Sequence, residues 1–99
     1  MLVAVGPEVT GHRARRSFGV VAGTATTGAT SSVASKQEIQ AARAAALVEL
    51  LQNAAHFGAN GVVDLRFEMT SLGDRNIAVL AYGVAVWLVP LEGELGNRK

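Results

Sequence analysis

The stretch HFGANGVVDLRFE, His56 to Glu68, lies between two different hydrophobic patterns and decides how the chain folds. Before this stretch, apolar residues recur at helical spacing, and within it they begin to alternate as in a half-buried strand. Gly58 stands where a helix that ends in a left-handed residue needs glycine, and Asn60-Gly61 is a common turn pair. We therefore interpret the stretch as a helix-to-strand junction, in preference to a catalytic or phosphate-binding loop.

The pattern before the junction predicts one long helix from Lys36 to Phe57, opened by a capping box in which Ser35 is followed three residues later by Glu38. One face is apolar apart from Arg43, and it carries Ile39, Ala42, Ala46, Leu47, Leu50, Ala54 and Phe57. A second face is also apolar, with Val48 and Leu51 among small alanines. A helix that covers its own sheet needs only one apolar face, so the second face predicts contact with another helix or subunit.

Two strands are predicted before the helix. The first is the short apolar run Met1 to Val5, which Gly6-Pro7 ends. The second is Arg13 to Ala25, in which simple alternation places Phe18, Val20 and Ala22 on one face and Ser17, Gly19, Val21 and Gly23 on the other. Glycines repeated along one face indicate the close approach of another backbone or ring. The polar segment from Thr24 to Ser35 is interpreted as a loop.

Two further strands are predicted after the junction. Val62 to Thr70 alternates, with Val63, Leu65, Phe67 and Met69 on one face and Asp64, Arg66, Glu68 and Thr70 on the other. Ile77 to Val89 is apolar on both faces, the second of which carries Leu80, Tyr82, Val84, Val86 and Leu88. A single helix covers only one face of a sheet, so we expect association to cover the other. The predicted oligomer contacts are Val48, Leu51, Leu80, Val84 and Val86.

Composition limits the organisation and the class of protein. Ninety-nine residues with 49% apolar content predict one α+β domain over residues 1–89, with a flexible polar tail over 90–99. The sheet is expected to be small and mostly antiparallel, in the order β-β-α-β-β. No apolar run is long enough to cross a bilayer and no signal-peptide pattern is present, so a cytoplasmic protein is expected.

Residues that could carry chemistry are few. The chain has no cysteine, which removes thiolate nucleophiles and Cys-type metal sites, and His12 and His56 have no partner ligands at recognisable spacing. Asp64 and Glu68 lie about 13 Å apart along a strand, beyond the roughly 5 to 9.5 Å of paired catalytic carboxylates. With Arg66 between them, they are interpreted as a polar row between subunits. No catalytic residue, metal ligand or cofactor is predicted.

The basic residues and the tryptophan are the remaining candidate binding groups. Arg13, Arg15 and Arg16 form the only dense basic run in a chain of net charge +1, and they lack interleaved aromatic residues. We therefore interpret them as solvated or as pairing with anions at a subunit border, and expect no nucleic-acid partner. Trp87, on an apolar strand face, is interpreted as a core or interface residue rather than a flavin platform.

Several segments taken together resemble the YbjQ-like family, whose members are often labelled heavy-metal-binding domains. These segments are the early Val3-x5-Val9-x-Gly11, Gly19-Val20-Val21-Ala22-Gly23, the Ala-rich helix with Arg43, the run from Gly58 to Phe67, and Leu80 to Val86. The resemblance implies a small α+β subunit in a homo-oligomer, typically a pentameric ring. Family members usually carry a longer segment where this chain has only Thr24 to Ser35. The metal label is not carried over to any residue.

The sequence therefore predicts a non-enzymatic homo-oligomer, which the resemblance implies to be a pentameric ring, with room for a small ligand or ion between subunits. The alternative is a flavin-storing oligomer, because the element order is also similar to that of dodecins and Trp87 or Tyr82 could stack on an isoalloxazine ring. An enzyme that uses Asp64 or Glu68 with Arg66 at a subunit border is the third and least favoured hypothesis.

Overall fold

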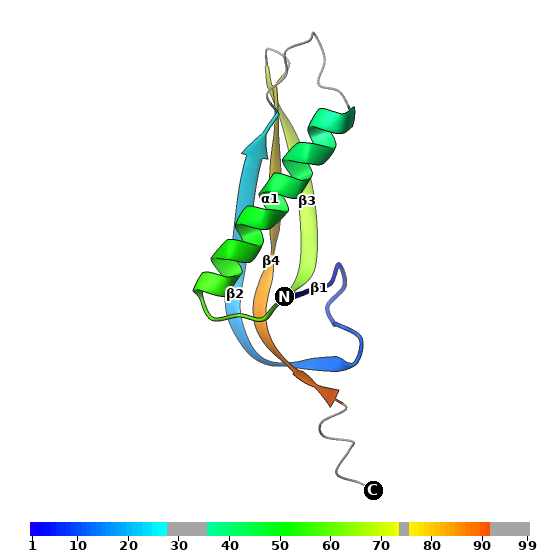
Figure 1. Cartoon of the computed structure of the whole chain (residues 1–99), viewed down its shortest axis with the longest axis vertical. Coiled ribbons are helices and arrows are strands. Elements are labelled where there is room, and N and C mark those ends of the chain that lie inside the picture. Colours follow the sequence, from blue (N-terminus) through cyan, green and yellow to red (C-terminus); the bar gives the residue numbers. More distant parts are fainter. Residues whose placement is uncertain (28–35, 74–75, 92–99) are drawn as a thin grey trace, which may run out of the picture.

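The computed structural model describes residues 1–27, 36–73 and 76–91, in which one long helix lies across one face of a four-stranded sheet (Figure 1). The elements are β1 (Leu2–Val3), β2 (His12–Thr26), α1 (Lys36–His56), β3 (Gly61–Gly73) and β4 (Asn76–Pro90). The α+β class and the order of elements predicted from the sequence are confirmed. Within the described residues, no helix is apolar enough over a sufficient length to span a membrane.

The sheet has the strand order β1-β3-β4-β2. The central strand β4 is antiparallel to both β3 and β2, while the short β1 is parallel to β3. Since β2 and β3 both run opposite to β4, they are parallel to each other, and α1 provides the crossover between them. The sheet is therefore mixed, with antiparallel pairing along its three long strands.

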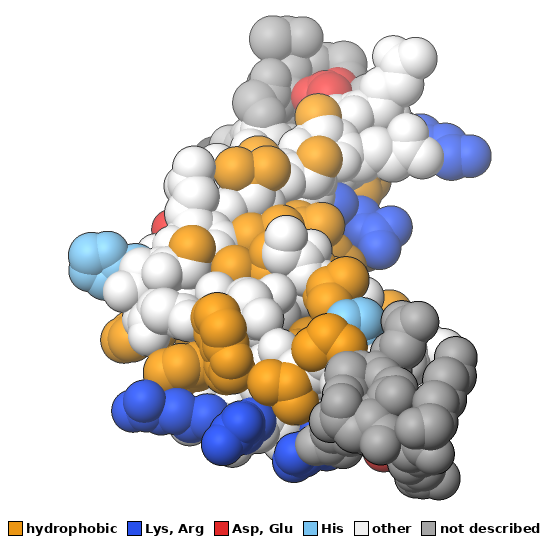
Figure 2. Space-filling view, turned by 60° about the horizontal axis from the view of Figure 1, so that its bottom comes forward, with side chains coloured by type: hydrophobic (Ala, Val, Ile, Leu, Met, Phe, Trp, Pro, Cys, Tyr) orange, Lys and Arg blue, Asp and Glu red, His pale blue; other side chains and the backbone are white. Residues whose placement is uncertain are grey.

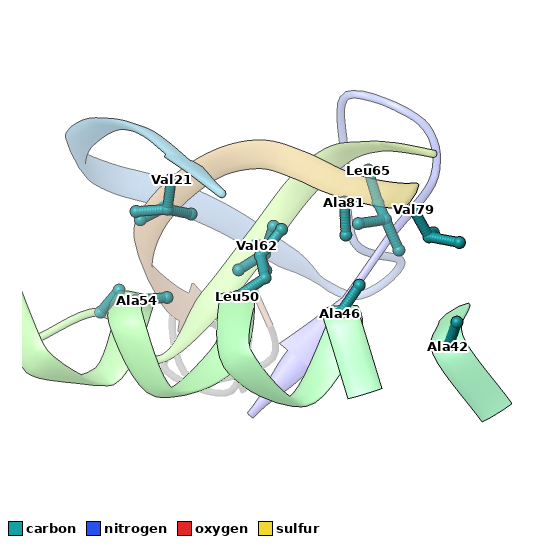
Figure 3. Packing of buried hydrophobic residues seen from close by; sticks show 11 residues of the cluster. Val21, Ala42, Ala46, Leu50, Ala54, Val62, Leu65, Val79 and Ala81 are labelled. Atoms are coloured by element: carbon teal, nitrogen blue, oxygen red, sulfur yellow. The ribbon is translucent and has the colours of Figure 1, made fainter. Parts of the chain in front are cut away.

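The core lies between α1 and the sheet. The helix buries residues four apart, Ala42, Ala46, Leu50 and Ala54, and Figure 3 shows them pointing at the sheet residues Val21, Val62, Leu65, Val79 and Ala81. Gly23 of β2 faces the backbone of Ala46 and Leu50 so closely that a Cβ atom would collide with both. The close backbone approach predicted from the repeated glycines is confirmed at this position. Arg43, on the same side of the helix, places its guanidinium 4.5 Å from the ring centre of Phe67.

The helix ends as the junction sequence predicts. Gly58 has a φ of 90°, its amide donates to Ala55 O, and the amide of Ala59 donates to Ala54 O. These two bonds form a Schellman motif, which satisfies carbonyls that the helix end would leave unpaired. Phe57, which was predicted to lie on the buried helix face, is 57% exposed because it follows the last helical residue, where the chain turns away. The predicted N-cap Ser35 lies outside the described residues.

The helix also protects the outer edge of the sheet. The amide of Thr24 donates to Glu49 Oε2 at 3.0 Å, and Asn53 Nδ2 donates to Ala22 O at 2.7 Å. Both backbone groups belong to β2, the edge strand, so side chains of α1 occupy positions where another strand could pair. Two polar residues of the helix therefore have a structural function.

The simple alternation predicted for β2 is confirmed from Gly19 to Gly23 but is wrong at Ser17 and Phe18, because the strand contains two bulges. Its register against β4 shifts between Ala14 and Arg16 and again between Ser17 and Gly19. Each bulge adds one residue and reverses the direction of the side chains that follow. Phe18 therefore packs against the core on the same side as Val21, while Val20 is 74% exposed on the other side.

The alternation predicted for β3 is also interrupted. The register against β4 shifts between Val63 and Arg66, and Asp64 has a φ of 56°, a left-handed conformation that Asp tolerates better than most residues. As a result, Leu65 packs beneath the helix, whereas Val63 lies in a second cluster with Val86 and Leu88. The prediction that Val63 and Leu65 share a face is wrong. For β4 the predicted alternation is confirmed, because Val79, Ala81 and Ala85 face the helix.

Candidate functional site

The face of the sheet opposite α1 carries apolar side chains that the described residues leave largely uncovered. We call this surface the open face and define it by Val20, Leu80, Tyr82 and Val84. Val20 pairs with Val84, which also pairs with Val63 of β3, so an apolar row crosses three strands. Leu80, Tyr82 and Val84 are half-buried, and Val20 is exposed.

One end of this side of the sheet is covered by the N-terminal segment. Ala4 and Val9 pack against the second cluster, which contains Val63, Val86 and Leu88. Val86, one of the five predicted oligomer contacts, is only 2% exposed and so has almost no surface to offer another copy. Leu80 and Val84 lie on the uncovered part.

The predicted polar row has contacts within the chain. Arg66 Nη1 donates to Val5 O at 2.7 Å and to Leu65 O at 3.0 Å, which fastens the N-terminal segment to β3. Asp64 is the bulge residue, and its amide donates to Gly6 O at 2.9 Å. Because of the bulge, Asp64 does not continue the regular spacing of Arg66 and Glu68, and the three do not form one even row.

Glu68 interacts with Tyr82 on the open face. A hydrogen bond to the Glu68 carboxylate raises the pKa of the Tyr82 phenol, and burial and the negative charge of Glu68 act in the same direction, against the opposing charge of Arg66. Arg66 lies directly opposite Tyr82 in the ladder, so the three side chains form one polar cluster at the border of the apolar row.

The outer surface of α1 is the second apolar surface predicted from the sequence. Val48 is 54% exposed, and the alanines at 41, 44 and 55 are also exposed. Leu51 is half-buried and packs against the core, so it combines a structural role with a partly accessible surface. We call this surface the outer helix face.

A concavity of about 600 Å³ lies where α1 ends over the sheet, and we call it the arginine-aromatic concavity. It is lined by Arg15, Arg16, Phe18, Phe57, Gly58 and Trp87. Figure 2 shows hydrophobic side chains gathered beside a row of Lys and Arg side chains at the end of the molecule that comes forward in that view. Trp87 is 43% exposed, and the Arg16 guanidinium lies 4.9 Å from the ring centre of Phe18.

The bulges of β2 explain why the sequence alone did not reveal this concavity. Arg16 pairs with Trp87, and the register shift leaves Arg15 as the extra residue beside it. Simple alternation would separate Arg15 from Arg16, and the sequence placed Phe57 on the buried helix face rather than at an exposed concavity. The only sequence sign was the cluster of arginines shortly before a phenylalanine and a glycine.

Comparison with known proteins gives the family. A family model described as "Putative heavy-metal-binding", that of the YbjQ family, matches residues 1–89. The chain belongs to the YbjQ family. This result confirms the resemblance read from the sequence.

Three curated relatives carry the same family-level name, UPF0145 protein. The chain is 37% identical over 54 residues to one from Bradyrhizobium sp. (strain ORS 278), covering 54% of this chain and 49% of the relative. It is 42% identical over 50 residues to one from Methanothermobacter thermautotrophicus, covering 50% and 44%. It is 39% identical over 56 residues to one from Mycobacteroides abscessus, covering 57% and 52%. The chain therefore matches about half the length of these relatives.

A solved structure has the same fold. The crystal structure of a protein of unknown function from Pediococcus pentosaceus, assigned to the DUF74 family, aligns with a TM-score of 0.69 at 16% identity. The alignment covers 90% of this chain and 98% of the other. At this identity, the likeness supports the fold of this YbjQ-family chain and does not extend to its function.

The description of the YbjQ family raises the question of a metal site, and the donor set of this chain does not fit one. Heavy metals prefer thiolate and imidazole ligands, and the chain has no cysteine and two histidines. His12 donates from Nδ1 to Thr10 O at 3.1 Å, and His56 stands on the exposed side of the helix beside Phe57. Among residues 1–27, 36–73 and 76–91, no three His, Asp or Glu side chains converge as a metal would require.

Proposed function

We propose that this YbjQ-family chain is an assembly module that forms a homo-oligomer, a ring of five copies, and has no enzymatic activity of its own. The observation that carries the proposal is the open face, where Val20 is 74% exposed at the end of an apolar row that crosses three strands. A contiguous apolar surface of this kind is typical of an interaction site. Five copies is the number that the family resemblance implies.

Two different apolar surfaces on one chain suit a ring. The open face lies on one side of the sheet, and the outer helix face lies on the other side of the molecule. An interface that joins two different surfaces is heterologous, and heterologous interfaces generate closed rings when the rotation between copies closes. We therefore expect the outer helix face of one copy, around Val48, to contact the open face of the next copy.

Both sheet edges have protected positions, which supports association through faces. Glu49 and Asn53 occupy backbone groups of the outer edge of β2. At the other edge, β1 pairs with the first residues of β3, and Arg66 fastens the segment that follows β1. Strand addition at these positions would have to break existing hydrogen bonds, whereas the open face needs only a partner that buries it.

The absence of enzymatic activity is proposed because the charged residues that the sequence singled out have structural partners. Arg66 binds backbone carbonyls, Glu68 binds Tyr82, and Asp64 forms the bulge. A catalytic pair would need an acid and a base aimed at a common substrate position. Arg66, Glu68 and Asp64 instead interact with other parts of the same chain.

The alternative of a flavin store is favoured by one observation and weakened by another. Trp87 is exposed in the arginine-aromatic concavity, as a stacking platform would be. Tyr82, the second predicted stacking residue, belongs to the alternate set of β4 side chains and lies on the opposite side of the sheet. A shared flavin sandwich between Trp87 and Tyr82 of one chain is therefore excluded by the fold.

Native mass spectrometry at micromolar protein concentration tests the proposed assembly. We expect a pentamer for the wild type and a shift to monomer for Val20→Glu, because the new carboxylate would be buried without a partner. Thr10→Glu adds the same charge at an exposed loop position and serves as the control that should keep the assembly. A wild-type chain that is only monomeric would overturn the proposal, and an unchanged pentamer in Val20→Glu would place the interface elsewhere.

A further inference from the structure

We infer that the arginine-aromatic concavity is a binding site for a planar aromatic ligand that carries a phosphate. All of its lining residues belong to a single chain, so this inference does not rest on the proposed ring. Its volume of about 600 Å³ lies within the roughly 300 to 1,000 Å³ of small-molecule sites.

The aromatic part of the site supplies a stacking surface. Three of the five aromatic side chains in the chain, Phe18, Phe57 and Trp87, line this one concavity. Phe57 is 57% and Trp87 43% exposed. Exposed aromatic side chains that line one concavity favour a flat ligand, because stacking contributes beyond the area it buries.

The cationic part supplies recognition of an anion. Within the described part of the chain, neither Arg15 nor Arg16 is paired with a carboxylate. Stacking on Phe18 orients the Arg16 guanidinium and leaves its N–H groups available at the edge of the site. Two guanidinium groups that share one concavity match the oxygen atoms of a phosphate, which arginine binds through paired hydrogen bonds.

The bulges of β2 determine where the arginine side chains and Phe18 of the concavity lie. The two bulges of β2 bring Arg15, Arg16 and Phe18 to the side of the sheet where Trp87 stands. A bulge interrupts the hydrogen-bond ladder between two strands. Bulges are common next to active sites, where they change the direction of a side chain. The C-terminal end of α1 carries a partial negative charge, which also favours two arginines nearby. Because the arginines could serve the helix end rather than a ligand, the aromatic and cationic contributions to binding must be tested separately.

Flavin mononucleotide and riboflavin are suitable probes, because they share the ring and differ by the phosphate. We expect flavin mononucleotide to bind, read by quenching of flavin fluorescence and of Trp87, the single tryptophan of the chain. Riboflavin should bind at least about tenfold more weakly, the loss that corresponds to one charge-assisted hydrogen bond. Adenosine monophosphate should compete, and inorganic phosphate alone should compete poorly.

Variants separate the two halves of the site. The double variant Arg15→Gln/Arg16→Gln should reduce the affinity for flavin mononucleotide to that for riboflavin, and Trp87→Leu should weaken both. Arg43→Gln removes a charge that stacks on Phe67, away from the concavity, and should leave both affinities unchanged. Circular dichroism of each variant checks that the fold is retained.

Three results would overturn the inference. The first is equal affinity for flavin mononucleotide and riboflavin, and the second is no binding of either up to about 1 mM. The third is unchanged affinity in the arginine double variant. The titration is repeated with Val20→Glu, so that loss of the ring and loss of the ligand site are read independently.

Discussion

Gly23 gives the most direct test of how the helix is positioned on the sheet. A Cβ at this position would collide with the carbonyl oxygen of Ala46 and the amide nitrogen of Leu50, and would lie 3.0 Å from the Cβ of Glu49. The first two are backbone atoms in the buried centre of the helix, so no change of rotamer can move them away. Gly23→Ala must therefore lift α1 from β2.

The loss in the free energy of unfolding can be estimated from the contacts that a displaced α1 would disturb. Overpacking of a core typically destabilises by about 1 to 3 kcal/mol. The same movement strains the hydrogen bonds that Glu49 and Asn53 make to β2, each worth about 1 kcal/mol net. We expect Gly23→Ala to lower the free energy of unfolding by about 3 kcal/mol, which corresponds to about 12 to 24 °C in Tm for a domain of this size.

Urea unfolding followed by circular dichroism measures this loss. Wild type and variant are compared at one protein concentration, because association would make the midpoint depend on concentration. Gly6→Ala is the matched control, since a Cβ at Gly6 meets nothing within 4 Å, and it should change stability by less than about 0.5 kcal/mol. If Gly23→Ala were as stable as this control, the close packing of α1 on β2 would be refuted.

Two other substitutions test local contacts. Asn60 donates from Nδ2 to Leu88 O and accepts at Oδ1 from Leu88 N, so Asn60→Ala should cost about 2 kcal/mol in urea unfolding, and a cost near zero would contradict this bridging role. The chain has one tyrosine, so ultraviolet absorbance reports the pKa of Tyr82 alone, and Glu68→Ala should lower that pKa toward about 10. Because folding raises this pKa, the stabilisation it represents is present below about pH 10 and is lost as pH rises through the folded value; an unchanged titration curve in Glu68→Ala would rule out the hydrogen bond as the cause.

The elements of the fold could be predicted from the sequence because their signals are local. The spacing of Ala42, Ala46, Leu50 and Ala54 predicts the buried helix face, and Gly58 predicts where the helix ends. The register of the strands could not be predicted in the same way. A bulge depends on how two strands pair, and nothing in the alternation of β2 or β3 marks the extra residue.

The same limit applies to the candidate sites. Leu80 and Val84 lie on the face opposite α1 as the alternation predicts, because β4 has no bulge and its alternation holds along the strand. Val86 belongs to the same set of side chains, but the N-terminal segment covers it, and the packing of a segment with little periodicity cannot be read from sequence. Trp87 and the arginines could be placed around one concavity only when the bulges of β2 were known.

The two kinds of surface on this chain follow from how its strands are built. Where β4 pairs without interruption, alternate side chains form two regular faces, one covered by α1 and one that the described residues leave partly exposed. Where β2 is interrupted, Arg15, Arg16 and Phe18 depart from that regularity and gather around Trp87 beneath the end of the helix. Because regular pairing makes a broad apolar face and bulges make a small polar-aromatic concavity, the proposed association and the proposed ligand site use different parts of the sheet, and we expect a change in one to leave the other undisturbed.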